Sequence, residues 1–195
     1  MRKAIDHLRR ADPILAAIID RVGPYKATFI DPEFGSLVRS IVYQQLSGKA
    51  AATIFGRLLD ATGRPLTPDS ILALDTDRLR TLGLSKQKAA YIRDLAEKTA
   101  AREVVFEKFP TMTDKQIVES LTRVKGIGVW TVQMYLMFAL RRPDVLPTGD
   151  LGIRNAIQKA YNLDAPPTPA QMEEIGACWR PYCSIASWYL WRSLE

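Results

Sequence analysis

A five-residue segment, Val124-Lys125-Gly126-Ile127-Gly128, constrains the fold of this chain more than any other feature. Apolar residues recur at helical spacing in residues 114–123 before it and in residues 129–140 after it, so the pattern predicts helix, tight hairpin, helix. The glycines let the main chain approach a ligand closely, and the second helix begins with unsatisfied N–H groups and the positive end of its dipole. The segment therefore predicts an anion site made of main chain.

The rest of the chain also has the punctuation of helices. Four pairs place a capping side chain before a proline, as is typical of the N-cap and first position of a helix: Asp12-Pro13, Asp31-Pro32, Thr67-Pro68 and Thr168-Pro169. Strand-like stretches are short, and the main candidate, Val104-Val105-Phe106, cannot form a sheet by itself. We therefore expect an all-α fold, with helices at about residues 2–10, 13–22, 32–45, 48–61, 68–73, 76–82, 86–101, 114–123, 129–140, 150–161, 169–177 and 181–193, and with Gly23, Gly63 and Gly83 as C-terminal stops.

Length and charge narrow the class of protein. The chain has 195 residues, enough for one core or for two small helical lobes that share a cleft. Its 27 lysines and arginines exceed its 21 aspartates and glutamates, which gives a net charge of +6 and an isoelectric point of about 9.4. This excess suits a polyanionic partner, although many basic proteins share it.

Cysteine and histidine are too scarce for several kinds of site. Cys178 and Cys183 are the only thiols, too few for the four thiolates of an iron–sulfur cluster, and the single histidine, His7, makes a zinc site or a histidine-based triad hard to assemble. We expect no metal, no cofactor, and two buried reduced thiols. No apolar run has the length of a membrane span, so we expect a protein that acts inside the cell and not at a membrane.

Further segments complete a pattern with the hairpin. They are Ile41-Val42-Tyr43-Gln44-Gln45-Leu46-Ser47-Gly48-Lys49-Ala50-Ala51, Leu82-Gly83-Leu84-Ser85-Lys86-Gln87-Lys88-Ala89, Asp150-Leu151-Gly152-Ile153-Arg154, Trp179-Arg180-Pro181-Tyr182 and Ala186-Ser187-Trp188-Tyr189-Leu190-Trp191-Arg192. In this order they resemble the helix-hairpin-helix and Gly/Pro-Asp superfamily of base-excision DNA glycosylases, and its DNA-3-methyladenine glycosylase II branch in particular. The resemblance begins at about Asp31 and leaves the first thirty or so residues without a purpose.

The resemblance implies a fold and an activity. The fold is two packed helical lobes with an active-site cleft between them, in one domain of residues 1–195 with its helix-hairpin-helix at about residues 114–140. The Phe109-Pro110 loop predicts the boundary between the lobes, near residues 109–112. The activity is that of a base excision repair enzyme, a monomer that binds double-stranded DNA containing damaged bases. It would hydrolyse the N-glycosidic bond of alkylated purines such as 3-methyladenine.

Asp150 is the expected catalytic residue. Cleavage of the bond between deoxyribose and base builds positive oxocarbenium character on the sugar, which an ionised carboxylate stabilises in a site that excludes water. An alkylated purine already carries positive charge and leaves as a neutral base, so the chemistry needs little general-acid help. Asp150 can equally cap the helix that begins at Leu151, and the two roles are compatible.

The residue at position 130 predicts base release without strand cleavage. In the resemblance, glycosylases that also nick the strand carry a lysine two places after the second hairpin glycine, where it forms a Schiff base with the sugar. Trp130 stands there in this chain, and an indole is no amine nucleophile. The implied activity is therefore that of a hydrolase without lyase activity.

Contacts with DNA are expected from the hairpin and from two lysines of the second segment. Any one lysine can equally lie on a solvated helix face. The damaged nucleotide must be flipped out of the duplex, and the resemblance assigns the filling of the gap to the loop after Tyr43, with Leu46 or Gln45 as the wedge. Alternatively, Leu46 packs in the core before a helix capped by Ser47. The expected DNA contacts are Lys125, Gly126, Ile127, Gly128, Thr131, Lys86 and Lys88.

Aromatic rings suit a flipped cationic base because their faces attract positive charge. The resemblance places Trp130 and Trp191 in the substrate pocket, and Tyr43 and Tyr182 are further candidates. Met134 stands where the best-known members have a tyrosine, a change that narrows the substrate range or reshapes the pocket. Trp188 and Tyr189 are expected to pack within the last helix.

Two alternative functions remain open. One is a helix-hairpin-helix protein that binds damaged or bent DNA without catalysis, and the other is a glycosylase for deaminated or oxidised bases. Asp150 beside aromatic residues favours an enzyme over a pure binder. The charge of alkylated purines disfavours the other lesions only moderately.

Overall fold

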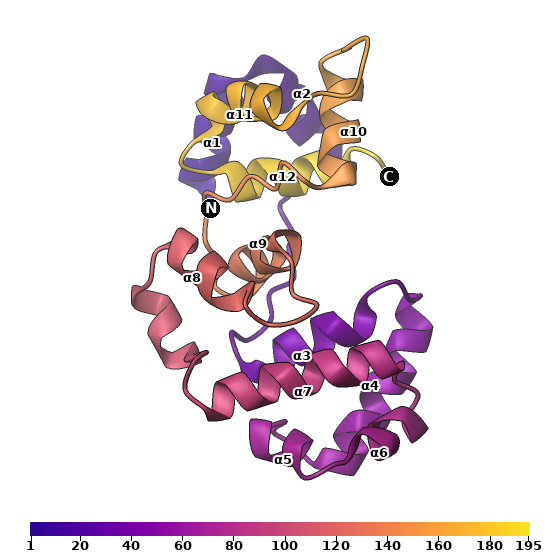
Figure 1. Cartoon of the computed structure of the whole chain (residues 1–195). Coiled ribbons are helices and arrows are strands. Elements are labelled where there is room, and N and C mark those ends of the chain that lie inside the picture. Colours follow the sequence, from indigo (N-terminus) through magenta and orange to yellow (C-terminus); the bar gives the residue numbers. More distant parts are fainter. The chain divides into compact units, whose positions relative to one another are not determined.

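The computed structural model describes residues 1–195 and confirms the all-α fold. The chain forms twelve α-helices and two short 3-10 helices, with no strand (Figure 1). They fall into two compact units. We call Ile30–Tyr135 the contiguous unit, and Met1–Phe29 together with Leu136–Glu195 the terminal unit.

The contiguous unit is arranged around one long helix. This helix, α7, buries Ile92 and Leu95 on the face that it turns toward the neighbouring helices, and α3 buries Leu37 and Ile41. Helices α3, α5 and α6 all pack against α7. The elements of this unit are α3 (Phe34–Tyr43), α4 (Gly48–Thr62), α5 (Pro68–Leu72), α6 (Thr76–Thr81), α7 (Lys86–Ala100), η1 (Phe106–Thr111), α8 (Asp114–Leu121) and the first part of α9 (Val129–Phe138).

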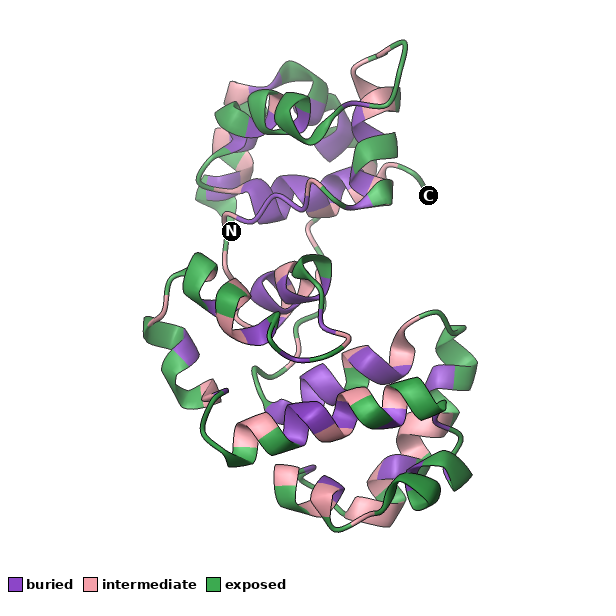
Figure 2. Ribbon diagram, in the orientation of Figure 1, coloured by how far each residue is buried: buried purple, intermediate pink, exposed green.

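The terminal unit is assembled from both ends of the chain. Its last helix, α12, is buried along most of its length, from Cys183 to Leu190 (Figure 2). Leu8, Leu15 and Ile19 of the first two helices belong to the same apolar core. The elements of this unit are α1 (Arg2–Ala11), α2 (Pro13–Val22), the end of α9, α10 (Leu151–Ala160), α11 (Pro169–Gly176), η2 (Ala177–Trp179) and α12 (Cys183–Arg192).

A buried carboxylate joins the first helices to the rest of the terminal unit. Asp12 is 5% exposed, and its Oδ1 caps α2 by accepting from the main-chain N–H groups of Ile14 and Leu15 at 2.9 and 3.0 Å. Its Oδ2 accepts from the Trp179 indole at 2.7 Å and from the Tyr161 hydroxyl. Residues 1–29, which the resemblance left without a purpose, therefore complete this core.

All twelve predicted helices are present, with ends that differ by up to two residues, but two local predictions were wrong, the cap before α3 and the burial of Cys178. Helix α3 begins at Phe34 with Glu33 as N-cap, because the Asp31 carbonyl is bonded by the Ser36 hydroxyl at 2.6 Å and the chain turns there first. Residues 104–106, the strand-like run that was not expected to form a sheet, are not a strand, and a 3-10 helix begins at Phe106. Cys178 is exposed: in the short η2 turn the side chain that faces the core is that of the neighbouring Trp179, whereas Cys183 is buried in α12.

The limits of the units also differ from the expected boundary near residues 109–112. That segment lies inside the contiguous unit, where Phe109 is fully buried and its ring lies 5.2 Å from Phe106 and 6.0 Å from Tyr135. The limits fall instead after Phe29 and within α9. A proline in a loop was a poor guide to a boundary, because the aromatic side chains around it are packed.

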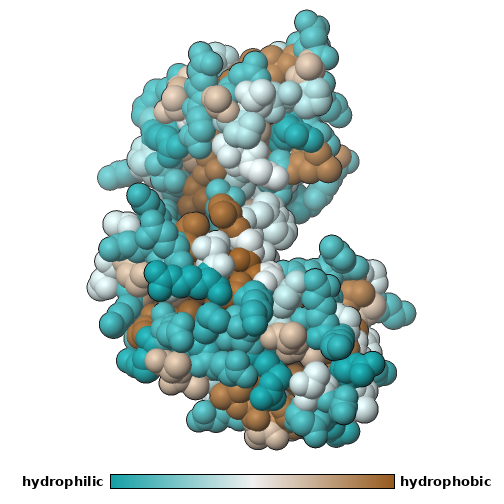
Figure 3. Space-filling view, in the orientation of Figure 1, coloured by the Kyte–Doolittle hydropathy of each residue, from teal (hydrophilic) through white to brown (hydrophobic).

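Hydrophilic residues cover much of the surface drawn in Figure 3. No helix has the length and apolar character needed to cross a lipid bilayer.

Candidate functional site

The hairpin between α8 and α9 needs glycine at its centre. Gly126 has φ +78°, and a Cβ there would lie 2.0 Å from a ring carbon of Tyr91. The Ile127 N–H donates to the Val124 carbonyl at 3.1 Å and closes the turn. Positive φ and contact with the Tyr91 ring thus both exclude a side chain at this position.

A carboxylate on α7 holds the hairpin in place. Asp94, 7% exposed, accepts from the Lys125 main-chain N–H at 2.9 Å and from the Lys98 ammonium at 2.8 Å. Burial raises the pKa of Asp94, but the hydrogen bonds and charges of Lys98 and Lys125 outweigh burial and leave this pKa below its ordinary value. The Lys125 ammonium also lies 3.7 Å from an Asp94 carboxylate oxygen, but the Lys125 side chain is 73% exposed, so this ammonium remains accessible to a partner in solvent.

The open end of the hairpin leads into the first turn of α9. No atom lies within 4 Å of the position that a Cβ on Gly128 would take, and Val129 and Trp130 are about half exposed, at 51% and 48%. Ile127 and Thr131 are buried. Of the residues predicted to contact DNA here, these two can therefore offer mainly their backbone, whereas Gly128 presents open main chain to an approaching phosphate.

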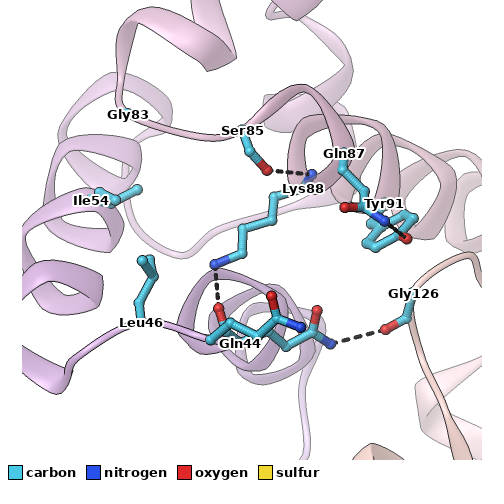
Figure 4. A pocket seen from close by; sticks show the side chains of 10 residues that line it. Gln44, Leu46, Ile54, Gly83, Ser85, Gln87, Lys88, Tyr91 and Gly126 are labelled. Carbon is cyan, nitrogen blue, oxygen red and sulfur yellow. Dashed lines mark hydrogen bonds between the residues drawn. The ribbon is translucent and has the colours of Figure 1, made fainter.

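The predicted wedge loop follows α3. Gln45 adopts φ +55° and is exposed, and Leu46 is 40% exposed, so Leu46 is not part of the core. Ser47 caps α4 by accepting from the Ala50 N–H at 3.4 Å, as the alternative interpretation of this segment required. The loop borders a cavity of about 410 Å³ that also touches α7 and Gly126 (Figure 4).

Lys88 contacts this loop directly. Its ammonium donates to the carbonyl of Val42 at 2.7 Å. Figure 4 shows the two other bonds, from the Lys88 ammonium to the Gln44 carbonyl at 2.6 Å and from the Gln44 side-chain amide to the Gly126 carbonyl at 2.9 Å. Burial lowers the pKa of Lys88. The other predicted lysine of this segment, Lys86, is exposed.

In the terminal unit, Asp150 is 8% exposed and caps α10. Its Oδ1 accepts from the Ile153 N–H and from the Trp191 indole N–H, both at 2.8 Å. A Cβ on Gly152 would lie 3.0 Å from both this oxygen and the Trp191 ring, so glycine leaves room for the pair. The capping role expected of Asp150 is present, and one carboxylate oxygen is fixed in direction by two donors.

The predicted aromatic residues have different surroundings. The Trp191 ring packs 6.0 Å from Phe138, beside its bond to Asp150, while Trp130 lies exposed at the start of α9 and Met134 is half-buried one turn later. Tyr43 lies under the Arg39 guanidinium at 4.0 Å, and Tyr182 packs edge-on against His7 at 5.4 Å. Trp188 and Tyr189 pack against Tyr25 in the terminal unit, as expected.

Sequence reasoning missed four residues of these sites. Asp94 and Tyr91 support the hairpin, Gln44 joins it to the wedge loop, and Gly152 makes room beside Asp150. Asp94 gave one usable signal, since an acidic residue on the apolar face of a helix is rare unless it has a partner. The other three gave none, because their contacts depend on the fold.

A family model, the HhH-GPD superfamily base excision DNA repair protein, matches residues 38–181 of the chain. The chain belongs to this superfamily. Among HhH-GPD proteins, DNA-3-methyladenine glycosylase 1 of Schizosaccharomyces pombe is 32% identical, over 99% of this chain and 87% of that protein. Two solved glycosylase structures, at 33% and 34% sequence identity, superimpose on 97% and 96% of the chain, which agrees with the all-α fold.

The first of these structures is the S. pombe 3-methyladenine DNA glycosylase in complex with abasic DNA, with a TM-score of 0.84, 33% identity and 95% of that chain covered. The second is a DNA-3-methyladenine glycosidase of Bacillus halodurans, with a TM-score of 0.86, 34% identity and 87% of that chain covered. The S. pombe sequence relative aligns with 99% of this chain, so helices α1 and α2 fall within the matched region.

Proposed function

We propose that this protein is a monofunctional DNA glycosylase that hydrolyses the N-glycosidic bond of alkylated purines, 3-methyladenine and related bases, flipped out of duplex DNA. The observation that carries the proposal is the Asp150 carboxylate, nearly buried and oriented by the Ile153 N–H and the Trp191 indole. Similar proteins are named for 3-methyladenine, and one was solved with abasic DNA, the product of base removal.

Asp150 stabilises the positive charge that develops on the sugar as the base departs. A carboxylate that is already oriented and largely shielded from water needs no reorganisation at the transition state, which increases its electrostatic effect. In the proposed mechanism the same carboxylate also orients or deprotonates the attacking water. Trp191 has two roles here, because its N–H fixes Asp150 and its ring offers a face to a cationic base.

The main chain of the hairpin binds the DNA backbone. Gly128 and the first turn of α9 offer N–H groups in open space, and the exposed ammonium of Lys125 adds charge beside them. Lys86 supplies a further cation at the start of α7. These contacts are to phosphates, so they position the duplex and carry no sequence information.

Leu46 is our choice for the wedge, with Gln45 beside it. An exposed leucine at a loop tip that is held by hydrogen bonds suits insertion between bases, because it replaces the stacking that the flipped nucleotide gives up. Trp130 in place of a lysine supports base release without strand cleavage. A neutral leaving group explains why a chain with one histidine suffices for the chemistry.

The test is chromatography of the bases released from methylated duplex DNA by the purified protein, with hypoxanthine- and uracil-containing duplexes beside it. We expect 3-methyladenine from the first and little from the others, and an intact strand on a denaturing gel before alkali. Asp150→Asn keeps a side-chain oxygen for the α10 cap, so it should fold and bind DNA but lose about two to three orders of magnitude in release.

Three outcomes would contradict the proposal. Turnover of Asp150→Asn within a few-fold of the parent protein would remove the catalytic role of this carboxylate. Release of hypoxanthine or uracil in preference to methylated purines would favour the second kind of glycosylase. Salt-sensitive DNA binding without any base release would favour the non-catalytic binder.

A further inference from the structure

We propose that Lys88 and Gln44 form a clasp that holds the wedge loop in its inserting shape and fixes its position against the DNA-binding hairpin. The clasp consists of the two hydrogen bonds from the Lys88 ammonium, to Val42 and Gln44, and the one from the Gln44 amide to Gly126. Figure 4 draws the bond from Lys88 to Gln44 and the bond from Gln44 to Gly126. Both residues are positioning residues, and neither touches the reacting atoms. This inference rests on the proposed function, because it assigns a part in base flipping.

Lys88 is placed to act on the loop. It lies in the first turn of α7, and its ammonium is shared between the carbonyls of Val42 and Gln44, at 2.7 and 2.6 Å. Bonds from a charged donor are about twice as strong as neutral ones. The two acceptors lie at the end of α3 and just before the loop tip, so one side chain fixes the direction in which the chain leaves the helix.

The main chain of the loop does little to hold itself. Its two internal hydrogen bonds, from the Gln44 N–H to Ile41 and from the Leu46 N–H to Tyr43, are 3.4 Å long, beyond the usual range for such bonds. Between them Gln45 adopts a left-handed conformation, at φ +55°. A loop with such weak internal bonding needs outside partners to stay ordered, and the clasp provides them.

The Gln44 side chain links the loop to the hairpin. Its amide donates to the Gly126 carbonyl at 2.9 Å, across 82 residues of sequence, and Gly126 is the position where the Tyr91 ring excludes any side chain. The distance from wedge to hairpin is thereby set inside one compact unit. When the hairpin binds a phosphate, the tip at Leu46 is held at a fixed distance from it.

The same geometry removes Lys88 from the phosphate-binding cations. The Lys88 ammonium donates hydrogen bonds to two carbonyl oxygens, whereas Lys86, two residues earlier, is exposed. A lysine that contacts a phosphate releases a counterion on binding, and its loss reduces the salt dependence of affinity. Lys88 and Lys86 therefore make a matched pair with opposite expected behaviour.

The experiment compares release of 3-methyladenine from one methylated strand, single-stranded and in duplex, under single-turnover conditions. A wedge matters only where a base stack has to be opened. Lys88→Met should reduce release from the duplex about tenfold, the effect expected for lost hydrogen bonds to a charged group, and change release from the single strand by less than about twofold. Lys88→Arg keeps donors for both carbonyls and should restore most of the duplex rate.

Three comparisons complete the design. Gln44→Leu should show the same duplex-specific loss to a smaller degree, since it removes one neutral bond. Lys86→Met should weaken binding to both substrates and flatten the salt dependence, which Lys88→Met should leave unchanged. Lys108→Met, an exposed lysine of η1, is the control for loss of a surface charge.

A readout without DNA separates this inference from the proposed function. Hydrogen exchange of the amides in residues 44–47 should be faster in Lys88→Met than in the parent protein. Equal losses on both DNA substrates, a flattened salt dependence for Lys88→Met, or unchanged amide exchange would each overturn the clasp. Absence of base release by the parent protein would refute the glycosylase proposal, and the exchange result would then still decide whether the clasp exists.

Discussion

Replacement of Asp12 by alanine should destabilise the terminal unit strongly. The substitution removes the α2 N-cap, worth about 1 kcal/mol, from the N–H groups of Ile14 and Leu15. It also leaves two donors without an acceptor, the indole of fully buried Trp179 and the hydroxyl of Tyr161, at about 1–3 kcal/mol each. Because the three losses share one site and do not simply add, we expect about 3–5 kcal/mol.

Asp12→Asn isolates part of this effect. The amide oxygen can keep the α2 cap, but the amide nitrogen then faces the Trp179 N–H, so the expected loss is about 1.5–3 kcal/mol. Asp20→Ala is the control, because Asp20 pairs with Arg9 on the surface of the same unit with a side chain 62% exposed, and such pairs contribute at most about 1 kcal/mol.

Urea unfolding followed by tryptophan fluorescence is the suitable assay. Three of the four tryptophans, Trp179, Trp188 and Trp191, lie in the terminal unit, so the signal reports mainly on its unfolding. The order of stability should be parent and Asp20→Ala, then Asp12→Asn, then Asp12→Ala. A loss below about 1 kcal/mol for Asp12→Ala would refute the idea that this carboxylate joins the first helices to the core.

Three further predictions concern the sites. Gly126→Ala should lower both stability and affinity for any DNA, because its Cβ would overlap the Tyr91 ring, and unchanged urea midpoint and binding would contradict this. Trp191→Phe keeps a ring but removes the donor to Asp150, so base release should fall about tenfold or more with little change in DNA affinity; equal rates would show that the hydrogen bond is idle. The pKa of Asp94 is lowered in the folded protein, so its stabilisation of the hairpin is complete above about pH 4 and is lost as the pH falls through the folded value. The urea midpoint should accordingly fall more steeply below about pH 4 in the parent protein than in Asp94→Asn.

Local signals in the sequence predicted much of the fold. Capping side chains at Asp12, Thr67 and Thr168 and the stops at Gly23 and Gly63 are where the pattern put them, because caps and left-handed turns depend on a few adjacent residues. Asp31-Pro32 also has the local pattern of a cap, but α3 begins two residues later, at Phe34, with Glu33 as its N-cap. The Ser36 hydroxyl, five residues further along, donates to the Asp31 carbonyl, and the pair alone does not show this.

In the candidate site, too, the local features were predictable from the sequence and the contacts between distant segments were not. Hairpin glycines and the Asp150 cap are local features, and the sequence indicates them directly. Lys88 was ambiguous, since a lysine after a turn is equally a surface cation or a donor to a carbonyl 44 residues away. Only the packing of α7 against α3 decides between them, and no spacing rule contains that information.

The sequence predicted the first two helices but did not show what they pack against, for a related reason. Their partners, Tyr161 and Trp179, stand about 150 residues or more further along the chain, at separations of 149 and 167. A buried aspartate with aromatic donors has no periodic signature. The resemblance to a family could not supply one either, because it rested on segments after Asp31.

The discontinuous terminal unit has a consequence for folding during synthesis. On the ribosome, α1 and α2 emerge before Ile30–Tyr135, whereas α10 and α12, which share a core with Leu8, Leu15 and Ile19, emerge after it. Ile30–Tyr135 can collapse while translation continues, but the apolar faces of α1 and α2 remain exposed to solvent until α10 and α12 have been synthesised. A ribosome stalled before residue 150 would therefore expose the apolar faces of α1 and α2, which chaperones and proteases can then bind.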